Sequence, residues 1–182
     1  MSQLRMQFMM VLATIVLFLL MVAINEWLFK YAEFLPGISW IYLPAGIRLL
    51  STLLFGGAGA IGLLIVSWLI SFFYFFPDDF LRAFVGGIVA TIGPYVVYKF
   101  AQHAFGLHAS LANLTPGRLL ICIVACSLAS PLLHHVWFAL HGYDQPLLHS
   151  FTVMFIGDLN GTLLVVYAVK IGLRFLPVRR MP

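Results

Sequence analysis

The chain has 182 residues, of which 63% are hydrophobic and only 9% are charged. This composition excludes a soluble globular protein and is typical of a protein that lies in a bilayer. The net charge of +4 requires no nucleic-acid partner, because basic residues that set membrane topology and contact anionic lipid account for it.

Continuous apolar runs predict an all-α bundle of about six transmembrane helices in a single integral-membrane domain, residues 1–182. A helix needs roughly 20 apolar residues to cross a hydrocarbon core of about 30 Å. Membrane β-barrels instead show alternating segments of about ten residues, which this sequence lacks. We expect the spans near residues 6–24, 39–56, 60–76, 82–104, 117–141 and 151–175.

Basic residues predict that both termini lie in the cytoplasm (N-in/C-in). With this orientation the outer side carries only Lys30 and Arg82, whereas the cytoplasmic side carries Arg5, Lys99, Arg118, Lys170, Arg174, Arg179 and Arg180. We therefore expect a multi-pass protein of the bacterial cytoplasmic (inner) membrane.

The first outer connection, near residues 26–35, has a helical pattern. Aromatic and apolar residues fall on one face, whereas Glu26, Lys30 and Glu33 fall on the other. This pattern predicts a short interfacial helix that anchors the chain at the membrane surface and ends at Pro36-Gly37.

Two ionisable residues, Arg48 and Asp158, lie inside apolar stretches and are not explained by topology. At about 1.5 Å per residue, both lie roughly 10–13 Å below the outer surface, and His134 and His135 lie about 10 Å below it. An unpaired charge at this depth costs at least a few kcal/mol, so we expect an ion pair between Arg48 and Asp158.

The resulting layer, with Asn160 added, has two interpretations. It is a polar clamp that fixes helix register and binds nothing, or it is an outward-opening pocket for a small anionic ligand. In the pocket, Arg48 presents its guanidinium to the ligand, Asp158 holds Arg48, and His134 and His135 add polar contacts.

We expect no cofactor, no metal and no enzymatic activity. Adjacent histidines point about 100° apart on a helix and do not easily share one ion. Cys122 and Cys126 share one helix face and are interpreted as packing residues. No nucleophile elbow or oxyanion loop is legible in the sequence.

Two segments resemble the bacterial MASE-type integral-membrane sensor domains. The run Trp40-Ile41-Tyr42-Leu43-Pro44-Ala45-Gly46-Ile47 is similar to their opening signature, and Gly157-Asp158-Leu159-Asn160-Gly161 is similar to a Gly-Asp-x-x-Gly segment in a late span. The resemblance implies a membrane sensor fold with a candidate ligand layer around Pro44, Arg48, Asp158 and Asn160. Members usually precede a signalling output domain, and we expect no such domain within residues 1–182.

Three functions stay open at this point. The first is a sensor-like or small-molecule-binding module that acts through a partner chain. The second is an accessory subunit of a larger membrane complex, and the third is a substrate-binding component of an uptake transporter. All three place the chain in contact with the lipid bilayer and with another membrane protein.

Overall fold

The chain folds as an all-α bundle, as the sequence predicts. The computed structural model describes residues 2–108, 110–142 and 146–175. In chain order the elements are α1 (Gln3–Phe29), η1 (Lys30–Ala32), β1 (Glu33–Leu35), β2 (Ile38–Ser39), α2 (Pro44–Phe55), α3 (Gly57–Ile70), η2 (Ser71–Phe75), α4 (Phe80–Phe105), α5 (Pro116–Leu140) and α6 (Leu147–Arg174). Here η1 is a 3-10 turn and η2 is a π-helical turn that extends α3.

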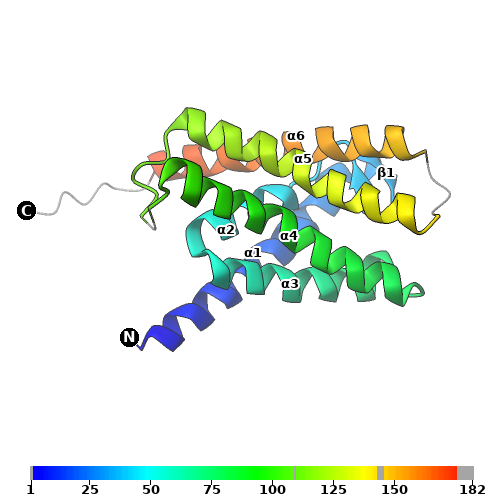
Figure 1. Cartoon of the computed structure of the whole chain (residues 1–182), viewed down its shortest axis with the longest axis horizontal. Helices are drawn as coiled ribbons and strands as arrows, with labels where there is room; N and C mark the ends of the chain where they lie inside the picture. The colour runs from blue at the N-terminus through cyan, green and yellow to red at the C-terminus, as the bar shows by residue number, and fades with distance from the viewer. Residues whose placement is uncertain (1, 109, 143–145, 176–182) are drawn as a thin grey trace, which may run out of the picture.

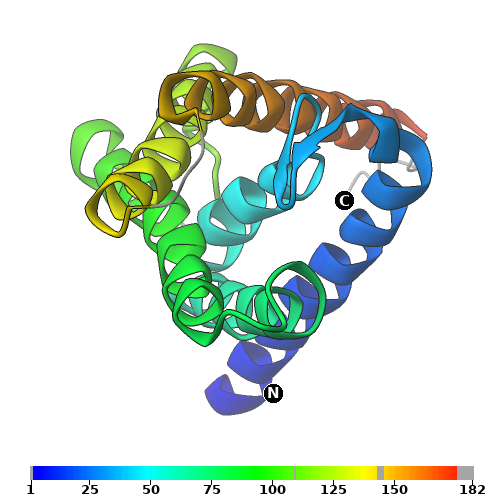
Figure 2. The ribbon, with the colours of Figure 1, turned by 90° about the vertical axis from the view of Figure 1, so that its right-hand side faces the viewer.

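The second predicted span, 39–56, is not a complete membrane helix, and this part of the prediction is wrong. Five helices of the described chain are long and apolar enough to cross a membrane, whereas α2 has only 12 residues, or about 18 Å. Residues 40–43 are non-helical, and the helix begins at Pro44, whose fixed φ and missing N–H suit a first helical position. Figure 2 shows α2 in the centre of the ring of longer helices, and it contacts all five of them.

The expected interfacial helix near 26–35 is also absent from the structure. Residues 26–29 continue α1, and β1 and β2 then form a small antiparallel hairpin around Pro36-Gly37. Gly37 has a φ of +79°, and its N–H donates a hydrogen bond to Glu33 Oε1 at 3.2 Å. Turn chemistry therefore outweighs the helical pattern here.

The non-helical segment that follows the hairpin, residues 40–43, lies directly against α6. A Cβ atom at Gly157 would overlap the carbonyl oxygen of Ser39, and one at Gly161 would overlap that of Tyr42. The two glycines therefore let the segment approach the helix backbone closely.

The backbone of this segment is hydrogen-bonded to its neighbours. The Tyr42 N–H donates to the Gly157 carbonyl at 3.0 Å, and the Leu43 N–H donates to Asn25 Oδ1 of α1 at 2.9 Å. The Trp40 N–H donates to the Ala32 carbonyl at 2.9 Å. Such pairing makes irregular backbone tolerable at membrane depth, because no water replaces these bonds there.

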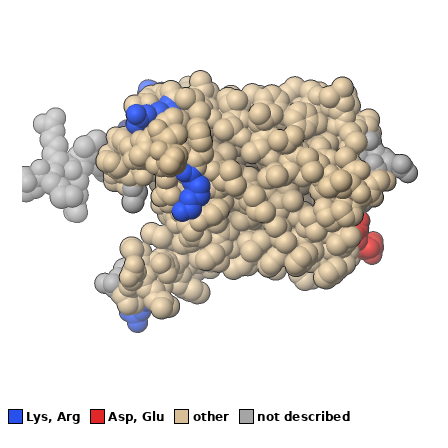
Figure 3. Space-filling model, viewed as in Figure 1, with Lys and Arg blue, Asp and Glu red and all other residues tan. Residues whose placement is uncertain are grey.

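The start of α1 and the end of α6 lie at the same end of the bundle, as an N-in/C-in topology requires (Figure 1). Lys and Arg side chains gather at that end in the view of Figure 3, and acidic side chains lie at the opposite end. We call the end that carries the hairpin and the α3–α4 connection the outer end. The orientation relative to the cell stays a prediction.

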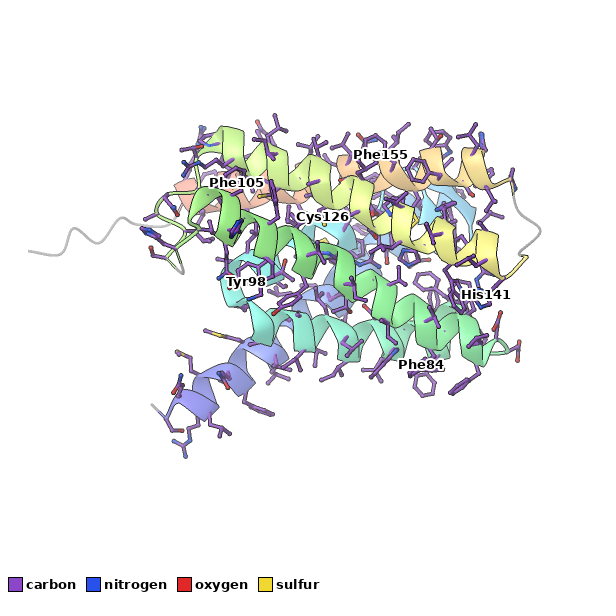
Figure 4. The ribbon with its side chains drawn as sticks, in the orientation of Figure 1. Phe84, Tyr98, Phe105, Cys126, His141 and Phe155 are labelled. Atoms are coloured by element: carbon purple, nitrogen blue, oxygen red, sulfur yellow. The ribbon has the colours of Figure 1, made fainter. Side chains whose placement is uncertain are left out.

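The inner half of the bundle is a closed apolar core. Leu49 and Leu53 of α2 pack with Val97 of α4 and with Cys122 and Cys126 of α5, all of them buried. Figure 4 shows Cys126 in the middle of the bundle. The cysteines are free thiols in this core, which agrees with their interpretation as packing residues.

Candidate functional site

A cavity lies in the outer half of the bundle. Its volume is about 60 Å³, enough for several water molecules or a small ion. Its walls come from the hairpin turn, the π-helical turn η2, the connection to α4, and all six α-helices. The lining residues are Phe18, Pro36, Gly37, Ile38, Tyr42, Arg48, Ser67, Ile70, Ser71, Phe75, Phe76, Arg82, Gly86, Val89, Ala90, His134, Trp137, Phe138 and Met154.

Arg48 is the buried charge of this cavity, and it is only 8% exposed. Its guanidinium carbon lies 5.1 Å from the ring centre of Tyr42 and 5.6 Å from that of Phe18. Nη2 donates a long hydrogen bond of 3.4 Å to the Tyr42 hydroxyl. Nε and Nη1 have no hydrogen-bond partner among the residues that the structure describes. Two aromatic faces thus hold the cation while most of its donors stay open.

Two further donors line the same cavity without using their hydrogen-bonding capacity. The Ser67 hydroxyl of α3 and the Trp137 indole N–H of α5 are buried and have no partner within the described residues. Buried polar groups are nearly always paired in native proteins. Donors from three different helices, α2, α3 and α5, thus converge on one cavity.

Arg82 is a second arginine of the cavity, and it is not among the site residues that the sequence predicts. Its guanidinium carbon lies 4.1 Å from the ring centre of Phe76 and 5.3 Å from that of Phe138. The sequence offered a weak signal: Arg82 falls in the first turn of α4, where its N–H donates to the capping Asp79 carboxylate at 3.0 Å. A basic residue there is explained by topology, and only the fold shows that it lines the cavity.

Of the two predicted histidines, only His134 lines the cavity. His134 lines the cavity, and its Nδ1 donates to the Ser130 carbonyl at 2.8 Å. His135 faces α6 instead, where its Nδ1 donates to the Pro131 carbonyl at 2.8 Å and its Nε2 lies 2.8 Å from the Ser150 hydroxyl. One histidine thus belongs to the site, and the other joins two helices.

The expected ion pair between Arg48 and Asp158 does not form, so this prediction is wrong. Asp158 of α6 is 3% exposed and does not line the cavity. It is close enough to Arg48 for their charges to interact, and it faces Ser130 of α5. The guanidinium lies instead near the rings of Phe18 and Tyr42, which line the cavity with it.

The two remaining predicted residues support the chain around the site without lining it. Asn160 is half-buried, and its side-chain amide donates to the Trp40 carbonyl at 3.4 Å. Pro44 is fully buried at the first position of α2. Both fix the irregular segment that carries Tyr42 into the cavity.

The donor set does not suit a metal ion. Within the described ranges, no group of three or more His, Cys, Asp or Glu side chains is arranged to hold one. The cavity presents cations and N–H groups, which bind anions.

No family model, curated protein or solved structure matches the chain, so the MASE-type resemblance stays a prediction.

Proposed function

We propose that this protein is a non-enzymatic, sensor-like membrane module that binds a small anion in the outer cavity and acts through a partner chain in the bacterial inner membrane. The observation that carries this proposal is the buried guanidinium of Arg48, which faces the cavity with two nitrogens unpaired among the described residues. A buried charge without a partner costs several kcal/mol, and a bound anion removes that cost.

The lining favours an oxyanion. The Arg48 guanidinium, the Ser67 hydroxyl and the Trp137 indole are donors that approach from different helices, and Arg82 adds a second positive charge. Several acceptor oxygens on one small group match this arrangement. A carboxylate, nitrate or sulfate has this chemistry, and so does the phosphate of a lipid head group.

The position of Arg48 supports a sensing role. It lies on α2, which contacts all five long helices and begins at a segment held by its neighbours. A ligand that binds Arg48 therefore contacts α2, the helix that touches the five others. The likeness of the Pro44 and Asp158 segments to MASE-type sensors agrees with this, because these two segments pack against each other.

Anion binding to purified protein in chloride-free detergent solution tests the proposal. We expect nitrate, acetate or sulfate to raise the unfolding temperature of the wild type. Arg48→Met should weaken binding by about 10- to 100-fold, the value of one or two charged hydrogen bonds. The control is Arg118→Met, because Arg118 donates to the Asn113 carbonyl outside the cavity. Equal binding by wild type and Arg48→Met would refute the site.

A second experiment distinguishes a free anion from a lipid head group as the ligand. The same titrations are run in nanodiscs of zwitterionic lipid and in nanodiscs that contain phosphatidylglycerol. If the ligand is a free ion, both discs show equal apparent affinity after correction for surface charge. If the ligand is a lipid head group, the anionic lipid alone raises the unfolding temperature and prevents further binding of nitrate, and Arg48→Met removes both effects.

The alternative in which the layer only fixes helix register makes the opposite prediction for stability. A clamp loses several kcal/mol when Arg48 becomes methionine. If Arg48 instead serves to bind a ligand, its guanidinium contributes little to the stability of the ligand-free protein. The ligand-free Arg48→Met variant should then lose no more than about 1 kcal/mol of unfolding free energy. Reversible unfolding in mixed micelles measures this difference.

A second candidate function, an accessory subunit of a larger complex, is supported by α1. The first half of α1 extends away from the bundle (Figure 1), and only 11% of its most hydrophobic window is buried. Lipid or a neighbouring membrane protein covers such a helix. Co-purification of larger membrane chains at fixed stoichiometry, lost when Leu12 and Val16 become alanine, would favour this function.

A further inference from the structure

The walls of the outer cavity combine hydrogen-bond donors with apolar surface. The buried donor atoms without a described partner belong to Arg48 of α2, Ser67 of α3 and Trp137 of α5. Among the described residues, α1 contributes only Phe18 to the lining and α6 contributes only Met154, and both side chains are buried. The donors therefore reach the cavity from three helices, whereas the surface supplied by α1 and α6 is apolar.

The wall formed by α4 is also apolar, except at its outer end, and it leaves open space in front of a glycine. Besides Arg82 in its first turn, α4 contributes Gly86, Val89 and Ala90 to the lining. If a Cβ atom were added at Gly86, the only described atom within 4 Å beyond its own helix would be Ser71 Oγ, at 4.0 Å. Room for a small apolar group thus lies against this wall.

The size and the walls of the cavity restrict the class of anion that fits. A volume of about 60 Å³ holds roughly four to six water-sized groups. Sulfate and phosphate carry oxygen atoms in every direction, so the apolar walls would leave some of these oxygens without a donor, at a cost in free energy. A carboxylate carries both of its oxygens at one end, and a short alkyl tail gains free energy by covering apolar walls.

We infer that the ligand of the cavity is a short-chain monocarboxylate of about two to four carbon atoms, the size that the cavity volume admits. This inference rests on the proposed anion site and names its ligand class. The carboxylate oxygens accept hydrogen bonds from the Arg48 guanidinium and the Ser67 hydroxyl, which have free donors among the described residues. The alkyl tail lies against Gly86 and Ala90 of α4, where the wall is apolar and space is open.

Titration of the full-length protein in chloride-free detergent solution with the sodium salts of acetate, propionate, butyrate and hexanoate tests this inference. Burial of one methylene group is worth about fourfold in affinity, so the affinity should rise about fourfold from acetate to propionate and again to butyrate. Hexanoate should bind no better than butyrate, because it is too long for the cavity. Butyramide, which has the shape of butyrate without its charge, should not bind, and sulfate should bind more weakly than propionate.

A variant that fills the tail space separates the two ends of the ligand. Gly86→Val should lower the butyrate affinity at least tenfold and leave the nitrate affinity within about twofold of the wild type, because the added side chain occupies the open space of the α4 wall. Gly172→Val is the matched control, since no described atom lies within 4 Å of its added Cβ atom. Arg48→Met should weaken every carboxylate and abolish the chain-length trend, which excludes partition into the micelle as its cause.

The outcomes distinguish the ligand class from the anion site itself. Equal affinities for nitrate, acetate and butyrate, or wild-type butyrate affinity in Gly86→Val, would overturn the monocarboxylate and leave the anion site standing. Failure of nitrate, sulfate and every carboxylate to bind would overturn both. If Gly86→Val does not fold, the smaller substitution Gly86→Ala and the wild-type chain-length series decide, since a loss of butyrate affinity with unchanged nitrate affinity supports the inference and its absence refutes it.

Discussion

The stretch from Trp40 to Arg48 has hydrogen-bonded polar groups on one side and polar groups without a described partner on the other. On the side of α1 and α6, the backbone N–H groups of Tyr42 and Leu43 are paired at 3.0 and 2.9 Å. On the cavity side, a few residues away, donors of Arg48 and Ser67 have no partner among the described residues. The backbone N–H groups of the irregular segment therefore find their acceptors within the chain, on α1, η1 and α6. The unpaired donors of the cavity side are the groups to which we propose that an anion binds.

The strongest test of the α6 side is steric. Gly157→Val should destabilise the protein by about 3 kcal/mol or more, because its side chain would overlap the backbone of Ser39 and Trp40. Unfolding in mixed micelles measures this loss. Gly172→Ala on the same helix is the control, since no atom of the described residues lies within 4 Å of the added methyl group. Similar effects of the two variants would contradict the close docking of the irregular segment.

A smaller effect is expected for the hydrogen bond from α1. Asn25→Leu leaves the buried Leu43 N–H without an acceptor and should cost about 1–3 kcal/mol of unfolding free energy. Asn160→Leu should cost less, because its bond to the Trp40 carbonyl is long, at 3.4 Å, and half-exposed. If the two asparagine variants lose equal stability, the ranking of these contacts is wrong.

The smallest effect should come from the contact between α5 and α6. Ser150→Ala removes the hydroxyl that lies 2.8 Å from His135 Nε2 and should cost about 1 kcal/mol. Nitrate affinity should stay at the wild-type value, because neither residue lines the cavity. His134→Phe is the comparison variant. Because His134 lines the cavity, this substitution should change the nitrate affinity. An affinity change in Ser150→Ala would mean that the structural side and the cavity side are not separate.

The helical class and the depth of the polar layer follow from the sequence, because apolar run length and rise per residue determine both. Arg48 and His134, which the sequence places in one layer, line the same cavity. Depth does not give direction, however, and Asp158 and His135 do not line the cavity: Asp158 faces Ser130 of α5, and His135 faces Ser150 of α6. The hairpin was missed because Pro36-Gly37 was interpreted as the end of a helix. Arg82 was missed because a basic residue at a helix end has an ordinary topological explanation.

The broken second crossing also has a consequence for how the chain is assembled. The 12-residue helix α2 follows a non-helical segment whose peptide groups form no hydrogen bonds within a helix. Such a segment does not insert readily into lipid on its own. The acceptors for this backbone belong to α1 and η1, which are made earlier, and to α6, which is made about a hundred residues later. The Tyr42 N–H therefore gains its acceptor only once α6 has been made, whereas the acceptors of the Trp40 and Leu43 N–H groups are already present.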